Sequence, residues 1–138
     1  MKRKLMFSYG SNMLTDQAYQ RMPESIKIGN GWLADYEFLF TGNGVASIER
    51  KKNRNVPGIL YSVTKDDFEH MNIFEGFPVV YGCLELPIKI NGEYKSASVY
   101  INNSLSLKKI PSTAYLNKIL TGAKQSNIPT NHILNAYT

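Results

Sequence analysis

The sequence predicts an α+β domain whose strands form a small, mostly antiparallel β-barrel with flanking helices. Segments rich in β-branched and aromatic residues recur along the chain, short turns containing glycine and asparagine separate them, and only a few segments carry helix signals. A chain of 138 residues with 43% hydrophobic residues can build one core but is too short for two ordinary domains. We therefore expect residues 1–138 to form a single domain.

The first predicted elements are a strand and a short helix. Residues 4–8 are typical of a short buried strand, which the turn-forming residues Gly10-Ser11-Asn12 end. Thr15 can then cap a helix that runs to about Met22, where Pro23 stops it.

An antiparallel run of strands is predicted next. The strand-like segments are residues 26–28, 32–41, 45–48 and 58–63. The first three segments are separated by Gly29-Asn30-Gly31 and Gly42-Asn43-Gly44. Both sequences are typical of tight turns between antiparallel strands.

The second half of the chain predicts two helices around a hairpin. Thr64 can start a helix with Asp66 and Asp67 in its first turn, where negative charge suits the helix dipole. Gly76 and Pro78 end that helix.

Asn91-Gly92 is the strongest short hairpin signal in the sequence, with strands predicted over residues 80–90 and 94–101. After Pro111, Ser112 can cap a last long helix. Its apolar face comprises Tyr115, Leu116, Ile119, Leu120 and Ala123. Residues 129–136 can add a further turn or two.

The chain is basic, with 16 basic and 11 acidic residues and a formal net charge of +5. This charge raises the question of anionic partners. The densest basic run, residues 50–54, contains no aromatic residue and lies between strand-like segments. We interpret it as a solvated loop and expect no nucleic-acid partner.

The cysteine content and the N-terminus favour a cytoplasmic protein. Cys83 is the single cysteine, which excludes an internal disulfide and leaves no cysteine pair for a structural zinc. Residues 1–4 are basic like the start of a signal peptide, but residues 8–12 interrupt the apolar stretch at once. We expect no secretory or membrane-spanning segment.

Glu75 is the residue that the pattern of its helix does not explain. Phe68, Met71 and Glu75 follow one another at spacings of three and four, so an apolar stripe ends in a carboxylate. Burial and the negative end of the helix dipole both raise the pKa of such a carboxyl group, as a general base requires. The alternative is that the helix frays and Glu75 turns into water.

The loop Tyr9-Gly10-Ser11-Asn12 follows the first strand directly. A glycine that lets the chain turn sharply can direct several successive backbone N–H groups at one point and form an anion-binding nest. The alternative is a simple capped turn in which Ser11 and Asn12 bond their own backbone.

Several motifs together resemble the γ-glutamylcyclotransferase family in order and spacing. They are Phe7-Ser8-Tyr9-Gly10-Ser11-Asn12, Gly44-Val45-Ala46-Ser47-Ile48, Gly58-Ile59-Leu60-Tyr61, Phe74-Glu75-Gly76, Tyr81, Tyr100, Pro111-Ser112-Thr113-Ala114-Tyr115 and Gly122-Ala123-Lys124. The resemblance covers nearly the whole chain, and it implies a small barrel with flanking helices. It also implies that Glu75 is the catalytic acid/base.

The resemblance implies a substrate pocket as well. The family's substrate-binding segment falls on Met6, Phe7, Ser8, Tyr9, Gly10 and Ser11. Tyr115 takes the place of the aromatic residue that the family's C-terminal helix contributes, while Asn12 and Tyr81 are expected to support the pocket.

The implied reaction cyclises a γ-glutamyl group to 5-oxoproline and releases the attached amine. Because the nucleophile is the substrate's own α-amine, the reaction needs no serine, cysteine or metal, and we expect no cofactor. The expected partner is a small γ-glutamyl compound, and we expect a monomer or a homodimer. The alternative is a catalytically inactive binding or interaction module on the same fold.

The remaining candidates carry weaker signals. His70 lies four residues after Asp66, a spacing compatible with metal binding, but no third ligand is evident and a solvated histidine is favoured. His132 has no partner in the sequence. We interpret Cys83 as a small packing residue in a strand rather than a nucleophile.

Overall fold

The computed structural model describes residues 2–41, 44–104 and 110–137 and contains a five-stranded closed barrel in the order β1-β3-β2-β4-β5. The strands are β1 (Lys4–Ser8), β2 (Ile26–Phe40), β3 (Ala46–Val63), β4 (Tyr81–Ile90) and β5 (Glu93–Asn102). The helices are the 3-10 turn η1 (Ser11–Met13), α1 (Thr15–Arg21), α2 (Lys65–Glu75), α3 (Thr113–Gln125) and α4 (Asn131–Asn135). The predicted α+β barrel with flanking helices is confirmed.

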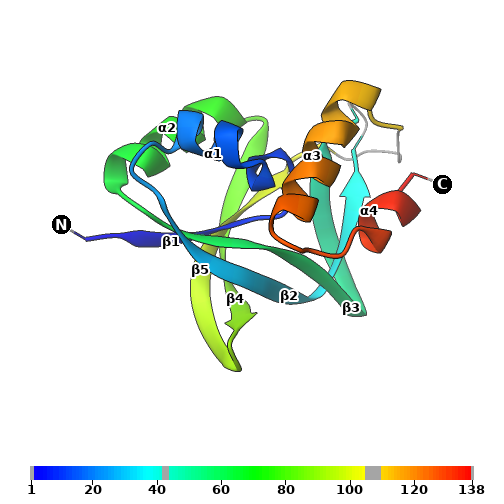
Figure 1. Cartoon of the computed structure of the whole chain (residues 1–138), viewed down its shortest axis with the longest axis horizontal. Helices are drawn as coiled ribbons and strands as arrows, with labels where there is room; N and C mark the ends of the chain where they lie inside the picture. The colour runs from blue at the N-terminus through cyan, green and yellow to red at the C-terminus, as the bar shows by residue number, and fades with distance from the viewer. Residues whose placement is uncertain (1, 42–43, 105–109, 138) are drawn as a thin grey trace.

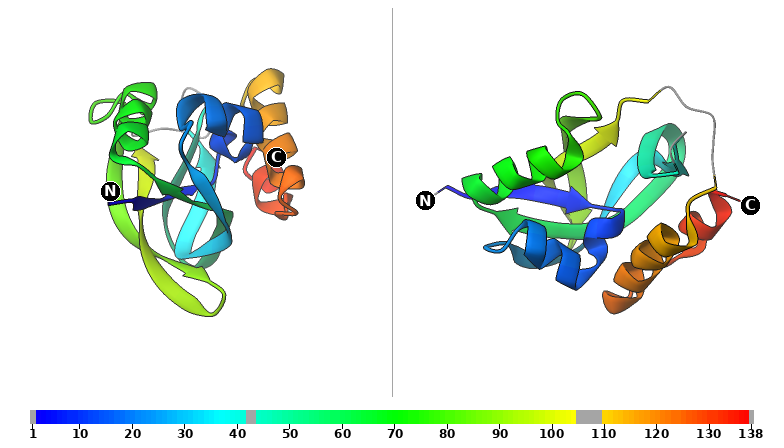
Figure 2. Two further views of the ribbon diagram at one scale, coloured as in Figure 1. Left: turned by 60° about the vertical axis from the view of Figure 1, so that its left-hand side comes forward. Right: turned by 90° about the horizontal axis from the view of Figure 1, so that it is seen from above.

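Strand pairing places β1 in the wall of the barrel, between β3 and β5. β1 pairs with β3 on one side, and a parallel contact between Met6 and Ser98 of β5 on the other side closes the barrel. The other strand pairs are antiparallel. In Figures 1 and 2, α1 and α2 lie together on one side of the barrel, and α3 and α4 cover another.

Predicted strands 26–28 and 32–41 are parts of one strand, β2, so the turn expected at Gly29-Asn30-Gly31 is wrong. A register shift between Lys27 and Gly29 bends the strand without ending it. Gly31 instead allows β2 to lie close to Ile88 of β4, because a Cβ at this position would lie 2.6 Å from the Ile88 side chain.

Residues 45–48 and 58–63 are likewise joined in β3, and the basic run 50–54 belongs to this strand. The prediction of a loop there is therefore wrong, although all five residues are exposed to solvent as expected. The register against β2 shifts between Ala34 and Tyr36, where β3 carries the extra residues, and the Asn53 amide donates to Asp35 Oδ1 at 3.1 Å. The turn predicted at Gly42-Asn43-Gly44 falls partly on residues 42–43, outside the described part.

The helix boundaries follow the local signals with one exception. Thr64 and Ser112 cap α2 and α3 as predicted, accepting hydrogen bonds from the amides of Asp67 (3.1 Å) and Tyr115 (3.2 Å). Thr15 is instead the first residue of α1, with Leu14 at the cap, and its hydroxyl donates to the Gln125 side chain on α3. Across the described ranges, no helix is long and apolar enough to cross a membrane.

Fully buried side chains attach the helices to the barrel. Met71 holds α2, and Ile119 and Ala123 hold α3, each with no exposed surface. Burying one side chain of the size of Met71 stabilises the fold by about 1.5–3 kcal/mol. These contacts fix the two helices that carry Glu75 and Tyr115.

Candidate active site

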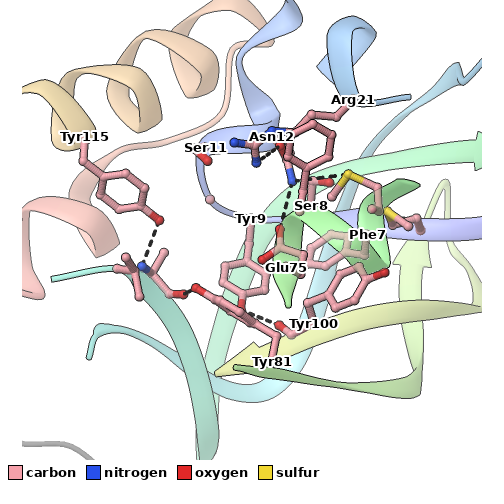
Figure 3. A pocket seen from close by; sticks show the side chains of 16 residues that line it. Phe7, Ser8, Tyr9, Ser11, Asn12, Arg21, Glu75, Tyr81, Tyr100 and Tyr115 are labelled. Carbon is pink, nitrogen blue, oxygen red and sulfur yellow. Dashed lines mark hydrogen bonds between the residues drawn. The ribbon is translucent and has the colours of Figure 1, made fainter. Parts of the chain in front are cut away.

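A pocket of about 200 Å³ opens where the end of β1, η1, α2 and α3 meet. Every site residue expected from the sequence lines it: Met6, Phe7, Ser8, Tyr9, Gly10, Ser11, Asn12, Glu75, Tyr81 and Tyr115. It is also lined by Arg21, Val45, Ala46, Met71, Phe74 and Tyr100, which were not among the expected site residues. Figure 3 shows that the labelled side chains come from α1, α2 and α3, from the loop after β1 and from several strands.

Gly10 is favoured by a close contact rather than by a left-handed turn. Its φ of −115° is not in the left-handed region, and it precedes η1. A Cβ at this position would lie 3.2 Å from Ala46 Cβ and 4.0 Å from Tyr115 Oη. Glycine therefore lets the loop pass close to β3 and α3 where the pocket opens.

Glu75 is the last residue of α2, and its side chain points into the pocket (Figure 3). Gly76 ends the helix in the left-handed conformation, with a φ of 64°. Burial raises the pKa of the Glu75 carboxyl group, while Arg21 and a 3.3 Å hydrogen bond from Asn12 Nδ2 oppose part of that rise. The helix therefore continues to Glu75 and holds its carboxylate against the pocket instead of fraying into water.

Four tyrosines form an uncharged wall around Glu75. Burial is the main cause that raises the pKa of Tyr9, Tyr81, Tyr100 and Tyr115. The Tyr81 hydroxyl donates to the Ala46 carbonyl at 2.8 Å, and the Tyr115 hydroxyl accepts from the Ala46 amide at 3.0 Å. Among the described residues, Glu75 is then the only acid that lines the pocket and can ionise near neutral pH.

The side chains of Ser11 and Asn12 do not bond their own backbone, which contradicts the capped-turn alternative. Ser11 Oγ and Asn12 Oδ1 both accept from Gln17 Nε2, at 2.8 and 3.1 Å. The backbone turn is closed instead by the Met13 and Leu14 amides, which donate to the Gly10 and Ser11 carbonyls at 3.1 Å each.

Arg21 is the main pocket residue that the sequence reasoning missed. It is nine residues from Asn12 in the sequence, and its Nη1 donates to Asn12 Oδ1 at 3.2 Å because α1 folds back over the loop. Its guanidinium group also lies over the Phe74 ring, 4.7 Å from the centroid. Phe74, which Arg21 contacts, belongs to the sequence motif Phe74-Glu75-Gly76, but nothing in that motif indicates Arg21.

The other candidates lie away from the pocket. In the ranges that the structure describes, no group of three His, Cys, Asp or Glu residues could hold a metal, and His70 is exposed. His132 packs against Phe38, with ring centroids 5.4 Å apart. Cys83 is half-buried against the core, and burial raises the pKa of its thiol.

Comparison with known proteins identifies a family for this chain. The family described as "Gamma-glutamyl cyclotransferase, AIG2-like" matches residues 6–117. The γ-glutamylcyclotransferase of Bos taurus is 27% identical over 142 residues, covering 91% of this chain and 72% of that protein. That of Mus musculus is 26% identical over 138 residues, with the same coverage.

A solved structure named "Gamma-glutamyl cyclotransferase" superimposes with a TM-score of 0.90 at 22% identity, covering 99% of this chain and 89% of that chain. The barrel and its flanking helices are therefore the fold of that protein. The family match spans the loop after β1, Glu75 and Tyr115, all of which lie around one pocket. The chain belongs to the γ-glutamyl cyclotransferase, AIG2-like family.

Proposed function

We propose that this chain is a γ-glutamylcyclotransferase that cyclises the γ-glutamyl group of γ-glutamyl amino acids or related γ-glutamyl amides to 5-oxoproline. The observation that carries the proposal is the position of Glu75. Its carboxylate lines a small pocket, is partly withdrawn from water, and receives a hydrogen bond from Asn12. A carboxyl group whose pKa is raised toward neutrality suits proton transfer in both directions.

The proposed reaction proceeds in two proton-transfer steps. Glu75 takes a proton from the substrate's ammonium group, and the free amine attacks the γ-carbonyl carbon, which closes the lactam ring and leaves an oxyanion. As the oxyanion collapses, the bond to the leaving nitrogen breaks, and the protonated Glu75 gives its proton to that nitrogen. The ring nitrogen still carries two hydrogens after the attack, and it releases one proton to solvent as the neutral lactam forms. The carboxylate is regenerated, so one residue serves both steps.

The rest of the pocket supports binding and orientation of the substrate. The loop of residues 9–12 lines one wall, and in this proposal its backbone N–H groups hold the substrate carboxylate or the oxyanion. Tyr81 and Tyr115 are fixed by their hydrogen bonds to Ala46, so the part of the pocket wall next to this loop is rigid and uncharged. A rigid wall favours a folded-back substrate in which the amine lies close to the γ-carbonyl.

A panel of γ-glutamyl compounds tests the proposal. The purified chain is incubated with γ-glutamyl amino acids, glutathione and γ-glutamyl-ε-lysine, and 5-oxoproline is quantified by mass spectrometry. We expect 5-oxoproline and the free amine in equal amounts from at least one compound, and about 10²-fold less 5-oxoproline, or lower still, with the Glu75→Gln variant. A protein that binds these compounds without releasing 5-oxoproline would be a binding module, and the proposal would be wrong.

A further inference from the structure

Four polar side chains form a connected network beside the pocket. Arg21 Nη1 and Gln17 Nε2, both from α1, donate to Asn12 Oδ1 at 3.2 and 3.1 Å. Asn12 Nδ2 in turn donates to Glu75 Oε1 at 3.3 Å. The dashed lines in Figure 3 follow part of this network from α1 to the end of α2.

Arg21 is the member of this network whose hydrogen-bonding polarity orients the Asn12 amide whatever the protonation state of Glu75. A guanidinium group donates and never accepts, so the group of Asn12 that faces Arg21 must be its oxygen. Gln17 cannot decide the orientation, because a glutamine amide can turn and present either a donor or an acceptor. With the oxygen held toward α1, the NH₂ group of Asn12 must face Glu75.

We propose that Arg21 is a positioning residue, which fixes the Asn12 side-chain amide so that its nitrogen, and not its oxygen, faces Glu75. An ionised carboxylate accepts a hydrogen bond from that NH₂ group, whereas a protonated carboxyl group would need an acceptor for its own proton. Arg21 thus favours the ionised form of Glu75. The catalytic consequence rests on the proposed function, because that form is the one that takes a proton from the substrate.

The surroundings of Glu75 leave Arg21 as the main opposing charge. Tyr9 from the loop after β1, Tyr81 from β4, Tyr100 from β5 and Tyr115 from α3 also face Glu75, and all four are neutral near pH 7, since burial raises the pKa of each above its ordinary value. Arg21 is the only cationic side chain lining the pocket within the described ranges.

Arg21 acts on Glu75 without touching it. In the part of the chain that the structure describes, the one ion pair within 4.0 Å joins Lys95 and Glu93. Both Asn12 and Gln17 are buried, with 8% of their surface exposed, so solvent does not compete strongly for the connecting hydrogen bonds. Arg21 lowers the pKa of Glu75 by its charge, and the hydrogen bond from Asn12 lowers that pKa separately. The proposed positioning role adds a second route from Arg21 to Glu75, through the Asn12 amide that Arg21 holds.

The test is an NMR titration of the Glu75 side-chain carboxyl carbon, assigned by its loss in Glu75→Gln. Arg21→Met should raise the titration midpoint by about one pH unit. Arg21→Lys keeps a donor-only cation, so its midpoint should lie closer to that of the wild type. The control is Arg54→Met, which removes an exposed arginine of β3 outside the pocket and should leave the midpoint unchanged. An unchanged midpoint in Arg21→Met, or a Lys midpoint no lower than the Met one, overturns the proposal.

A double-mutant cycle tests the transmission through Asn12. In an Asn12→Ala background, Arg21→Met should shift the midpoint less than it does in the wild type, because the connecting amide is gone. Equal shifts in both backgrounds would mean that Arg21 acts by charge alone, which contradicts the positioning role. If Asn12→Ala does not fold, the near-isosteric Asn12→Leu removes the same amide and provides the background for the same comparison.

If the enzyme is active, the ionisation of Glu75 should also appear in its kinetics, as the acid limb of the pH profile of kcat/KM. Arg21→Met should move this limb to higher pH by the same amount as the NMR midpoint, with a similar plateau at high pH. The two failures are distinguishable. An enzyme that forms no 5-oxoproline refutes the proposed function but leaves the NMR result valid, whereas an active enzyme with unshifted Arg21 variants refutes the positioning role alone.

Discussion

Gly122→Ala tests how α3, which carries Tyr115, is held against the loop that forms the pocket. A Cβ at Gly122 would lie 2.4 Å from the Leu14 nitrogen and 2.6 Å from the Met13 carbonyl carbon. Both are backbone atoms, so no side-chain rotation can relieve the overlap. Ordinary contact begins at 3.4 Å, so α3 must move away from η1 by roughly 1 Å.

Two opposing effects set the magnitude of this change. Helix propensity favours alanine over glycine by about 0.8–1.0 kcal/mol. Overpacking costs about 1–3 kcal/mol even where side chains can adjust, and here the clash is with backbone. We expect a net loss of about 1–2 kcal/mol in the free energy of unfolding, which lowers Tm by about 3–10 °C in a chain of this length.

The assay combines thermal unfolding by circular dichroism with kcat/KM on the same preparation. Tyr115 lies two turns before Gly122 on α3, so moving the helix also weakens the bond between Tyr115 Oη and the Ala46 amide and lowers kcat/KM. The matched control is Thr121→Ala, at the exposed neighbouring position, which should be neutral or slightly stabilising. A Gly122→Ala variant as stable as the wild type would refute this account of the helix contact.

Two further predictions concern the loop after β1 and the pH dependence of stability. Gly10→Val should lower kcat/KM by about tenfold or more while Tm falls little, because the added side chain would crowd Ala46 and Tyr115 at the pocket opening. A variant that is active but strongly destabilised would show that Gly10 does not belong to the site. Burial lowers the pKa of His132 to about 4 from 6.5, so the neutral form is favoured in the folded state and stability should fall as the pH drops from about 6.5 toward 4. Tm measured across that range should depend less on pH in His132→Phe, and an unaltered pH dependence would contradict this origin.

Local signals were sufficient to predict the helix that carries Glu75. Thr64 caps its start, Gly76 ends it in a left-handed conformation, and the spacing from Met71 places the carboxylate on the buried side. These features depend on residues within one or two turns of each other, which a sequence displays directly. The cap of α3 at Ser112 was predictable for the same reason.

Features that depend on distant parts of the chain could not be predicted in this way. Gly31, predicted from the sequence to be part of a turn, lies at a close contact instead, because a Cβ there would meet Ile88. A Cβ at Gly58 would likewise lie 2.4 Å from the Ser8 carbonyl oxygen. Arg21 joins the pocket only because α1 folds back over the loop after β1. No periodicity in the sequence reports such tertiary contacts.

The central claim is that Glu75 performs the proton transfers, and the most direct test compares binding with turnover in Glu75→Gln. The amide is nearly isosteric with the acid but cannot accept the ammonium proton. Substrate affinity measured by calorimetry should therefore stay within a few-fold of the wild type, while 5-oxoproline formation falls by about 10²-fold or more. Glu69→Gln, at an exposed position of the same helix, should retain full turnover. A Glu75→Gln enzyme that keeps more than about a tenth of wild-type turnover would contradict the account.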